Sequence, residues 1–198
     1  MFQKIKALRL FALLLTPLAL AACEDEFSSL PGGGSPHQEI VCKNSYGSGF
    51  YIAPNLVLTA AHVLPYKKCK IEMGEDSGKL VWKDTKRDIA VVYVKGKKSA
   101  FYPFQCDLPK EGSYVKLNSG KAIKKGRILS HNPDIVGNYF QTDISVRYGE
   151  SGSPLFHEDA VIGVLNFTNF DDGTLSYYRP IGDFCSKLNS LKKKYAGK

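Results

Sequence analysis

Short runs of apolar residues follow one another along most of the chain, and turn-forming residues separate them. From about residue 39, β-branched and aromatic residues gather at residues 50–52, 56–59, 79–82, 89–94, 114–117, 126–129, 139–143, 160–167 and 175–178. Turn signals such as Ala53-Pro54-Asn55, Asn118-Ser119-Gly120 and Asp171-Asp172-Gly173 stand between them. Many short strands at this spacing predict an all-β sandwich or barrel rather than alternating strands and helices.

Only the end of the chain has the periodicity of a helix. Phe184, Leu188 and Leu191 recur at helical spacing, which predicts a C-terminal α-helix over residues 181–195. Residues 102–109 are punctuated by prolines and lie near the middle of the mature chain. Such a segment is typical of a connection, here between two β halves.

The first 22 residues have a different pattern. Lys4, Lys6 and Arg9 precede a largely apolar stretch at residues 10–20, which Pro17 interrupts. A charged start, a short apolar stretch and small residues at its end are typical of a signal peptide. A membrane-spanning helix needs about 20 apolar residues, so an uncleaved anchor is the less favoured alternative.

The signal peptide is predicted to end at a lipidation site. Leu20-Ala21-Ala22-Cys23 resembles the bacterial lipobox, whose cysteine is lipidated and becomes the new N-terminus. The resemblance implies a membrane anchor at Cys23 in a bacterial cell envelope, at the periplasmic face of the inner membrane or in the outer membrane. A chance cysteine behind an ordinary cleavage site is the alternative. Residues 24–36 are acidic and then rich in Gly, Ser and Pro, so residues 23–38 are predicted to be a lipidated cysteine and a flexible tether.

The charge of the chain gives no indication of a nucleic-acid partner. A formal net charge of +8 comes from 27 basic and 19 acidic residues, and three basic and no acidic residues lie in residues 1–22. The remaining residues therefore carry +5. Their lysine clusters, at residues 67–68, 124–125 and 192–194, are not interleaved with aromatic residues as in nucleic-acid-binding surfaces. We expect a monomeric protein that binds no nucleic acid.

Four further cysteines make an even number in a chain that is predicted to be exported: Cys42, Cys69, Cys106 and Cys185. Two disulfides are expected, and three connectivities are open from the count alone. Reduced, buried thiols are the alternative. No two of these cysteines have the spacing of a zinc site, so neither a metal nor another cofactor is expected.

Three segments occur in an order that indicates catalysis. They are Leu58-Thr59-Ala60-Ala61-His62-Val63, Arg87-Asp88-Ile89-Ala90-Val91 and Gly149-Glu150-Ser151-Gly152-Ser153-Pro154. Each alone is common in a core or a loop. Together, in a β-rich exported chain, they resemble the T-A-A-H, D-I-A and G-D-S-G-G-P signatures of chymotrypsin-like serine proteases, in the His, Asp, Ser order of that family.

The resemblance implies a serine endopeptidase that acts on protein or peptide substrates with the triad His62, Asp88 and Ser151. A serine hydroxyl is a weak nucleophile until an imidazole takes its proton, and a buried carboxylate orients that imidazole. The same resemblance implies that the backbone N–H groups of Gly149 and Ser151 form the oxyanion hole.

The resemblance extends over about residues 40–195 and implies the fold as well. It implies two six-stranded antiparallel β-barrels, at residues 39–104 and 111–180, followed by the α-helix at 181–195. It also implies two disulfide pairings. Cys42–Cys69 would bracket the His62 hairpin, and Cys106–Cys185 would fasten the helix to the mid-chain connection.

Two positions beside Ser151 depart from the best-known members of the family. Glu150 stands where animal digestive relatives have the Asp that receives a newly freed N-terminus, so that activation switch is not expected here. Ser153 replaces the second Gly, as in the G-N-S-G-S-P form typical of bacterial V8-like glutamyl endopeptidases.

The substrate pocket is expected to be lined by Ser145, Asn166, Phe167, Thr168 and Leu175. Ser145 replaces the Asp of trypsin-like relatives, so cleavage after Lys or Arg is not expected. Asn166 stands where glutamyl endopeptidases have a His, which argues against a preference for Glu. Leu175 would make the pocket shallow and favour small apolar side chains.

Two other functions use similar residues. An α/β-hydrolase esterase needs G-x-S-x-G between a strand and a helix, with Ser before His, whereas here His62 precedes Ser151 and Ser153 occupies the fifth position. A catalytically silent, protease-like lipoprotein with a blocked cleft, used for binding or scaffolding, is the remaining alternative.

Overall fold

The computed structural model describes residues 35–66, 69–96, 99–131, 137–169 and 173–196. Its first half is a closed antiparallel barrel in which the strands are ordered β1-β2-β3-β6-β5-β4. The bounds of these strands are β1 His37–Cys42, β2 Ser45–Ala53, β3 Leu56–Ala60, β4 Ile71–Met73, β5 Asp76–Asp84 and β6 Ile89–Val94. A single 3₁₀ turn, η2 (Ala61–Val63), follows β3 directly.

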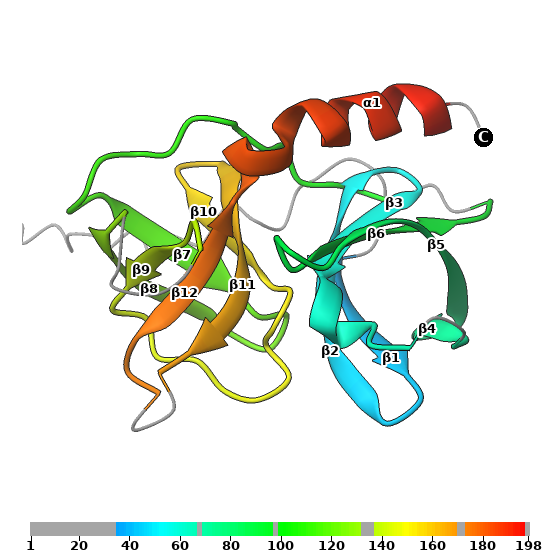
Figure 1. The fold of residues 1–198 in the computed structure, drawn as a ribbon, viewed down its shortest axis with the longest axis horizontal. Helices are drawn as coiled ribbons and strands as arrows, with labels where there is room; N and C mark the ends of the chain where they lie inside the picture. Colours follow the sequence, from blue (N-terminus) through cyan, green and yellow to red (C-terminus); the bar gives the residue numbers. More distant parts are fainter. Residues whose placement is uncertain (1–34, 67–68, 97–98, 132–136, 170–172, 197–198) are drawn as a thin grey trace, which may run out of the picture.

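The second half is another closed barrel, ordered β10-β11-β12-β9-β8-β7. Its strands are β7 Tyr114–Asn118, β8 Ile123–Ser130, β9 Phe140–Thr142, β10 Pro154–His157, β11 Ala160–Thr168 and β12 Ser176–Pro180. The 3₁₀ turn η3 (Ile181–Phe184) leads into α1 (Cys185–Tyr195). Figure 1 shows the two barrels side by side and α1 lying across one end of both. The predicted fold class, two six-stranded antiparallel barrels with a C-terminal helix, is confirmed.

The positions of the strands and of the helix differ from the prediction in three places. Strand β1 begins at His37, inside the stretch predicted to be tether, and its first three positions are polar, so it has no apolar run to mark it. Strands β4 and β10 have three and four residues, too few for a recognisable pattern. The first turn of the predicted helix is 3₁₀, and the α-helix itself begins at Cys185.

One apolar cluster joins the two barrels and the helix. It includes Phe50 of β2, Tyr102 of the connection, Phe156 of β10, and Leu188 and Leu191 of α1. The rings of Tyr102 and Phe156 meet edge to face with centroids 4.8 Å apart. Full burial of such a side chain contributes about 1.5–3 kcal/mol. The halves therefore pack against a shared core, and this fixes the junction at which the site lies.

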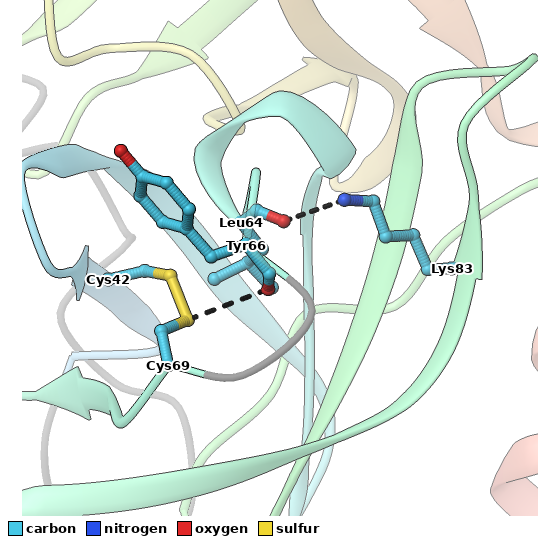
Figure 2. Close-up of a disulfide and its surroundings, with 5 residues drawn as sticks. All are labelled: Cys42, Leu64, Tyr66, Cys69 and Lys83. Atoms are coloured by element: carbon cyan, nitrogen blue, oxygen red, sulfur yellow. Dashed lines mark hydrogen bonds between the residues drawn. A yellow bond between two sulfur atoms is a disulfide. The ribbon is translucent and has the colours of Figure 1, made fainter.

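The structure contains the disulfides Cys42–Cys69 and Cys106–Cys185, the pairs that the family resemblance implies. The first lies beside the segment that follows η2, where Lys83 of β5 donates a hydrogen bond of 2.6 Å to the carbonyl of Leu64 (Figure 2). The second joins the connection between the barrels to the start of α1. Each bridge fastens a segment without regular structure to a barrel or to the helix.

The signal peptide predicted at residues 1–22, the lipidation site Cys23 and most of the tether lie outside the described residues. Among the helices that the structure describes, none has the length and apolar character needed to cross a membrane.

Candidate active site

His62 and Asp88 are brought together by the pairing of β3 with β6. These strands are antiparallel, and Ala60 at the end of β3 pairs with Ile89 at the start of β6. Asp88 therefore lies just before one strand and His62 just after the other. The His62 Nδ1 atom lies 2.7 Å from Asp88 Oδ2, and the backbone N–H of His62 donates to Asp88 Oδ1 at 2.8 Å.

The backbone of Asp88 has a conformation that orients its carboxylate. Its φ is +56°, in the left-handed region, which Asp tolerates better than most residues. The carbonyl of Asp88 accepts a hydrogen bond from the N–H of Ala61 at 3.1 Å. The side chain of Asp88 is thus placed by strand pairing and by a specific backbone turn.

Asn166 of β11 completes the surroundings of Asp88. Its side-chain amide donates to Asp88 Oδ2 at 2.7 Å and to the Asp88 carbonyl at 3.0 Å, while its own oxygen accepts from the N–H of Arg179. Asn166 is only 2% exposed. It was predicted as a pocket residue, and the structure shows in addition that it bridges the second barrel to the carboxylate of the first.

These donors determine the protonation state of Asp88. Burial disfavours the carboxylate, but the hydrogen bonds and charge of His62 and the hydrogen bond from Asn166 outweigh it and hold the pKa of Asp88 below its ordinary value. Asp88 is therefore ionised at neutral pH, which suits a group that orients and stabilises an imidazolium.

Ser151 lies at the contact between the two barrels. Its carbonyl accepts a hydrogen bond of 2.7 Å from the N–H of Ser48 in β2. Gly152 has a φ of +91°, and a Cβ there would lie 1.9 Å from the carbonyl oxygen of Ser48. Only glycine allows the chain to pass so close to β2 behind the serine.

The Ser151 hydroxyl donates to the carbonyl of Asn166 at 3.3 Å. In the described part of the chain no hydrogen bond joins it to the ring of His62. Hydrogen bonds between catalytic groups are often long or absent without substrate and tighten in the complex.

His62, Asp88 and Ser151 line one cavity of about 690 Å³. The other lining residues are Val146, Arg147, Tyr148, Leu165, Asn166, Phe167 and Thr168. Three of the five predicted pocket residues are therefore in this lining. Ser145 and Leu175 are not: Ser145 is exposed and its carbonyl accepts a hydrogen bond from Lys124, and the Leu175 carbonyl accepts one from Thr168.

Sequence reasoning missed the residues that hold the site from a distance. Ser48 donates through its hydroxyl to the carbonyl of Gly149, and Thr59 donates to the carbonyl of Ser48. Both are hydroxyl residues inside largely apolar strands, and both are buried. That combination is the one signal in the sequence that could have indicated them, because buried hydroxyls need partners.

Comparison with known proteins identifies the class. A family model described as a trypsin-like peptidase domain matches residues 47–164. This range is more than half of the chain and includes His62, Asp88 and Ser151. The chain therefore belongs to the trypsin-like peptidase family.

Several relatives are named as proteases. The chain is 34% identical over 139 residues to a "probable periplasmic serine endoprotease DegP-like" of Rickettsia conorii, covering 60% of this chain and 27% of that protein. A protein of the same name from Pseudomonas savastanoi pv. phaseolicola is 29% identical over 192 residues, covering 82% and 38%. The chain thus spans well under half the length of these relatives. The solved serine endoprotease of Yersinia pestis has the same fold, with a TM-score of 0.66 at 19% identity, covering 80% of this chain and 63% of that one.

Replacing Asn166 with leucine should raise the pKa of Asp88, because both side-chain hydrogen bonds to this residue disappear. A carboxylate with a lowered pKa stabilises the fold above its ordinary pKa, and this stabilisation is lost as the pH falls through the lowered value. In N166L Asp88 should therefore contribute less stability at neutral pH, and the loss of that contribution should be complete at a higher pH than in wild type. Acid unfolding monitored by circular dichroism measures this change in acid stability, and the Asn189→Ala variant, at an exposed position, is the control. Coincident acid midpoints for N166L and wild type would contradict the assignment.

Proposed function

We propose that the protein is a serine endopeptidase with His62, Asp88 and Ser151 as its catalytic triad. The observation that carries the proposal is the pairing of a half-buried, ionised Asp88 with His62 in a cavity that Ser151 also lines. Membership of the trypsin-like peptidase family and the names of the relatives support it.

The chemistry assigns one role to each group. Ser151 Oγ attacks the peptide carbonyl while His62 takes its proton, and the ester bond of the acyl-enzyme forms as the C–N bond breaks. His62 then gives that proton to the leaving amine, and a water molecule repeats the sequence to release the acid and free Ser151. Asp88 holds the imidazole ring and stabilises its cation. The N–H groups of Gly149 and Ser151 bind the oxyanion.

A fluorophosphonate probe tests the triad directly. We expect wild-type protein to gain the mass of the probe on Ser151 and the S151A variant to gain none. H62A and D88N should lower kcat on a peptide substrate by on the order of 10⁴-fold or more, because they remove the base or its orientation. If folded wild-type protein neither reacts with the probe nor cleaves peptides, the protein is not an endopeptidase, and the silent binding role becomes the better account.

The lining of the cavity supports an apolar P1 side chain, the one that precedes the scissile bond. Val146 and Leu165 are buried, and Tyr148 and Phe167 add aromatic surface. The one carboxylate in the lining belongs to Asp88, and His62 and Asn166 already occupy it. A substrate ammonium or guanidinium would therefore find no free counter-charge, whereas an apolar side chain would be partly removed from water against these residues.

Cleavage of matched peptides that differ only at P1 measures this preference. We expect kcat/KM for Leu or Phe to exceed that for Lys by about tenfold or more, since an ammonium group in this lining loses its hydration and meets no free carboxylate. The Phe167→Ala variant should lose part of the preference, and a variant at exposed Asn189 should keep it. Equal or faster cleavage after Lys would contradict the apolar assignment.

The proposal also gives the protein a place in the cell. We infer that residues 1–22 direct export and that lipid at Cys23 anchors a monomeric protease domain, through residues 24–36, in a bacterial cell envelope. The lipobox-like sequence supports the anchor. Two disulfides and relatives named periplasmic support an oxidising, extracytoplasmic compartment. Two acyl chains bind a membrane stably, whereas one chain binds only marginally.

Expression of the full chain in a bacterium fed with labelled palmitate tests the anchor. Wild-type protein should carry the label and sediment with membranes, and the Cys23→Ser variant should carry none and should not be processed at that site. The S151A variant is the control, since it should be labelled like wild type. Equal labelling of C23S and wild type would contradict lipidation at Cys23.

A further inference from the structure

The carboxylate of Glu150 is largely shielded from solvent beside Ser151 and has two specific partners. Its Oε2 atom accepts a hydrogen bond of 2.7 Å from the backbone N–H of Arg147 and lies 2.7 Å from Nζ of Lys124 on β8. The side chains of Glu150 and Lys124 are 14% and 24% exposed. Each member of this partly shielded pair depends on the other, because either charge left alone would be less well solvated than in open water.

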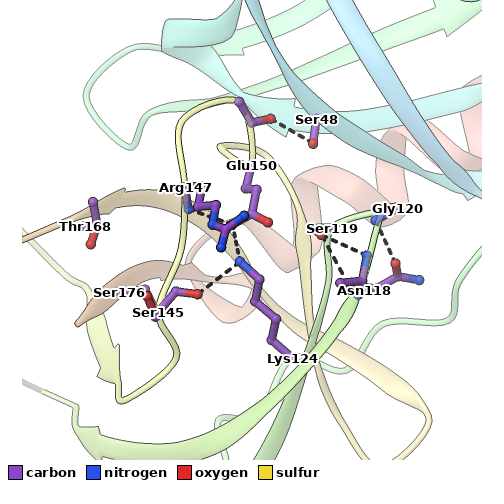
Figure 3. A network of polar contacts seen from close by, with 12 residues as sticks. Ser48, Asn118, Ser119, Gly120, Lys124, Ser145, Arg147, Glu150, Thr168 and Ser176 are labelled. Carbon is purple, nitrogen blue, oxygen red and sulfur yellow. Dashed lines mark hydrogen bonds and ion pairs between the residues drawn. The ribbon is translucent and has the colours of Figure 1, made fainter. Parts of the chain in front are cut away.

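Lys124 has a second contact that makes it more than a counter-ion. Its ammonium group also donates a hydrogen bond of 3.1 Å to the carbonyl of Ser145. Ser145 and Glu150 are the two ends of the segment that runs past the cavity toward Ser151. Figure 3 shows Lys124 reaching from β8 toward both of them. One ammonium group therefore closes this segment into a fixed loop.

Within this loop, residues 147–150 form a turn whose type can be assigned. The N–H of Glu150 donates to the carbonyl of Arg147 at 3.1 Å, and Gly149 in the third position has a φ of +90°. Tyr148, in the second position, does not have a positive φ. This combination defines a type II turn.

The turn type decides where the oxyanion donor points. Types I and II differ by reversal of the peptide between the second and third residues, here Tyr148 and Gly149. Reversal would turn the Gly149 N–H to the opposite side and place the Tyr148 carbonyl where a negative oxygen must bind. The Ser48 hydroxyl holds the turn on one side, because it donates to the Gly149 carbonyl at 3.0 Å. Lys124 and Glu150 hold the turn on the other side.

We propose that Lys124 is a positioning residue that acts through Glu150 to hold this turn in the type II form. The inference rests on the proposed endopeptidase activity and adds a means of keeping it permanently active. An internal ammonium on β8 neutralises the carboxylate beside the nucleophile, so no newly cleaved chain terminus is needed to set the Gly149 N–H. Lys124 touches neither substrate nor reacting atoms.

Kinetics of the full chain with Lys124→Met, Lys124→Arg and Lys125→Met test the proposal. Removing one oxyanion donor from a protease lowers kcat about 10²–10³-fold. If the Gly149 N–H points toward the oxyanion only part of the time, kcat should therefore fall about tenfold or more. K124M should show this loss in kcat with a smaller change in KM, and should bind a peptidyl boronic acid more weakly by a similar factor. K124R should recover most of both. K125M, which removes a neighbouring exposed lysine, should match wild type.

Glu150→Gln provides a second, independent measurement. It should lower kcat and boronate affinity as K124M does, and the double variant should be no worse than either single variant, because the two residues act as one pair. Thermal unfolding of each variant separates this effect from a loss of folded protein. If K124M does not fold, E150Q decides by the same measurements.

Wild-type kcat and boronate affinity in K124M or E150Q would overturn the proposal. Losses of kcat and boronate affinity that are no larger than the unfolded fraction of the variant would also overturn it. A wild-type protein that fails to react with boronate or peptide would overturn the endopeptidase activity itself, which is a different result.

Discussion

The hydrogen bonds from Asn166 to Asp88 are the interaction on which the rest of the site depends. They run from β11 of the second barrel to the residue just before β6 of the first, across 78 positions of sequence. His62 and Asp88 come from one barrel and Ser151 from the other, so the proposed triad is assembled only while the barrels keep one relative position. Asn166 also accepts the hydrogen bond of Ser151 through its carbonyl. A single buried residue thus contacts both Asp88 and Ser151.

The remaining structure keeps that junction in place. The apolar cluster around Phe50, Tyr102 and Phe156 excludes water between the barrels, and Leu188 and Leu191 of α1 cover it. The Cys106–Cys185 disulfide holds the helix against the connection. Backbone hydrogen bonds from Ser48 to Ser151 and from Gly152 to Leu165, both of 2.7 Å, then fix Ser151 between β2 and β11.

Sequence reasoning worked where the physics is local and where a family pattern is strong. Strands such as β3 and β6 have continuous apolar runs, and the His62, Asp88 and Ser151 segments match known signatures. It failed at β1, whose first residues are polar. The roles of Asn166, Ser48 and Lys124 come from contacts between barrels or between strands far apart in sequence, and no periodicity records such contacts.

A crystal structure of the protein with a peptidyl boronic acid tests the central claim, that the junction assembles a working triad, most directly. The account predicts a bond from boron to Ser151 Oγ, with one boronate oxygen within about 2.7–3.1 Å of the N–H groups of Gly149 and Ser151. His62, still held by Asp88, should face the boronate through Nε2. An inhibitor bound away from Ser151, or a Tyr148–Gly149 peptide with its N–H turned from the boronate, would contradict it.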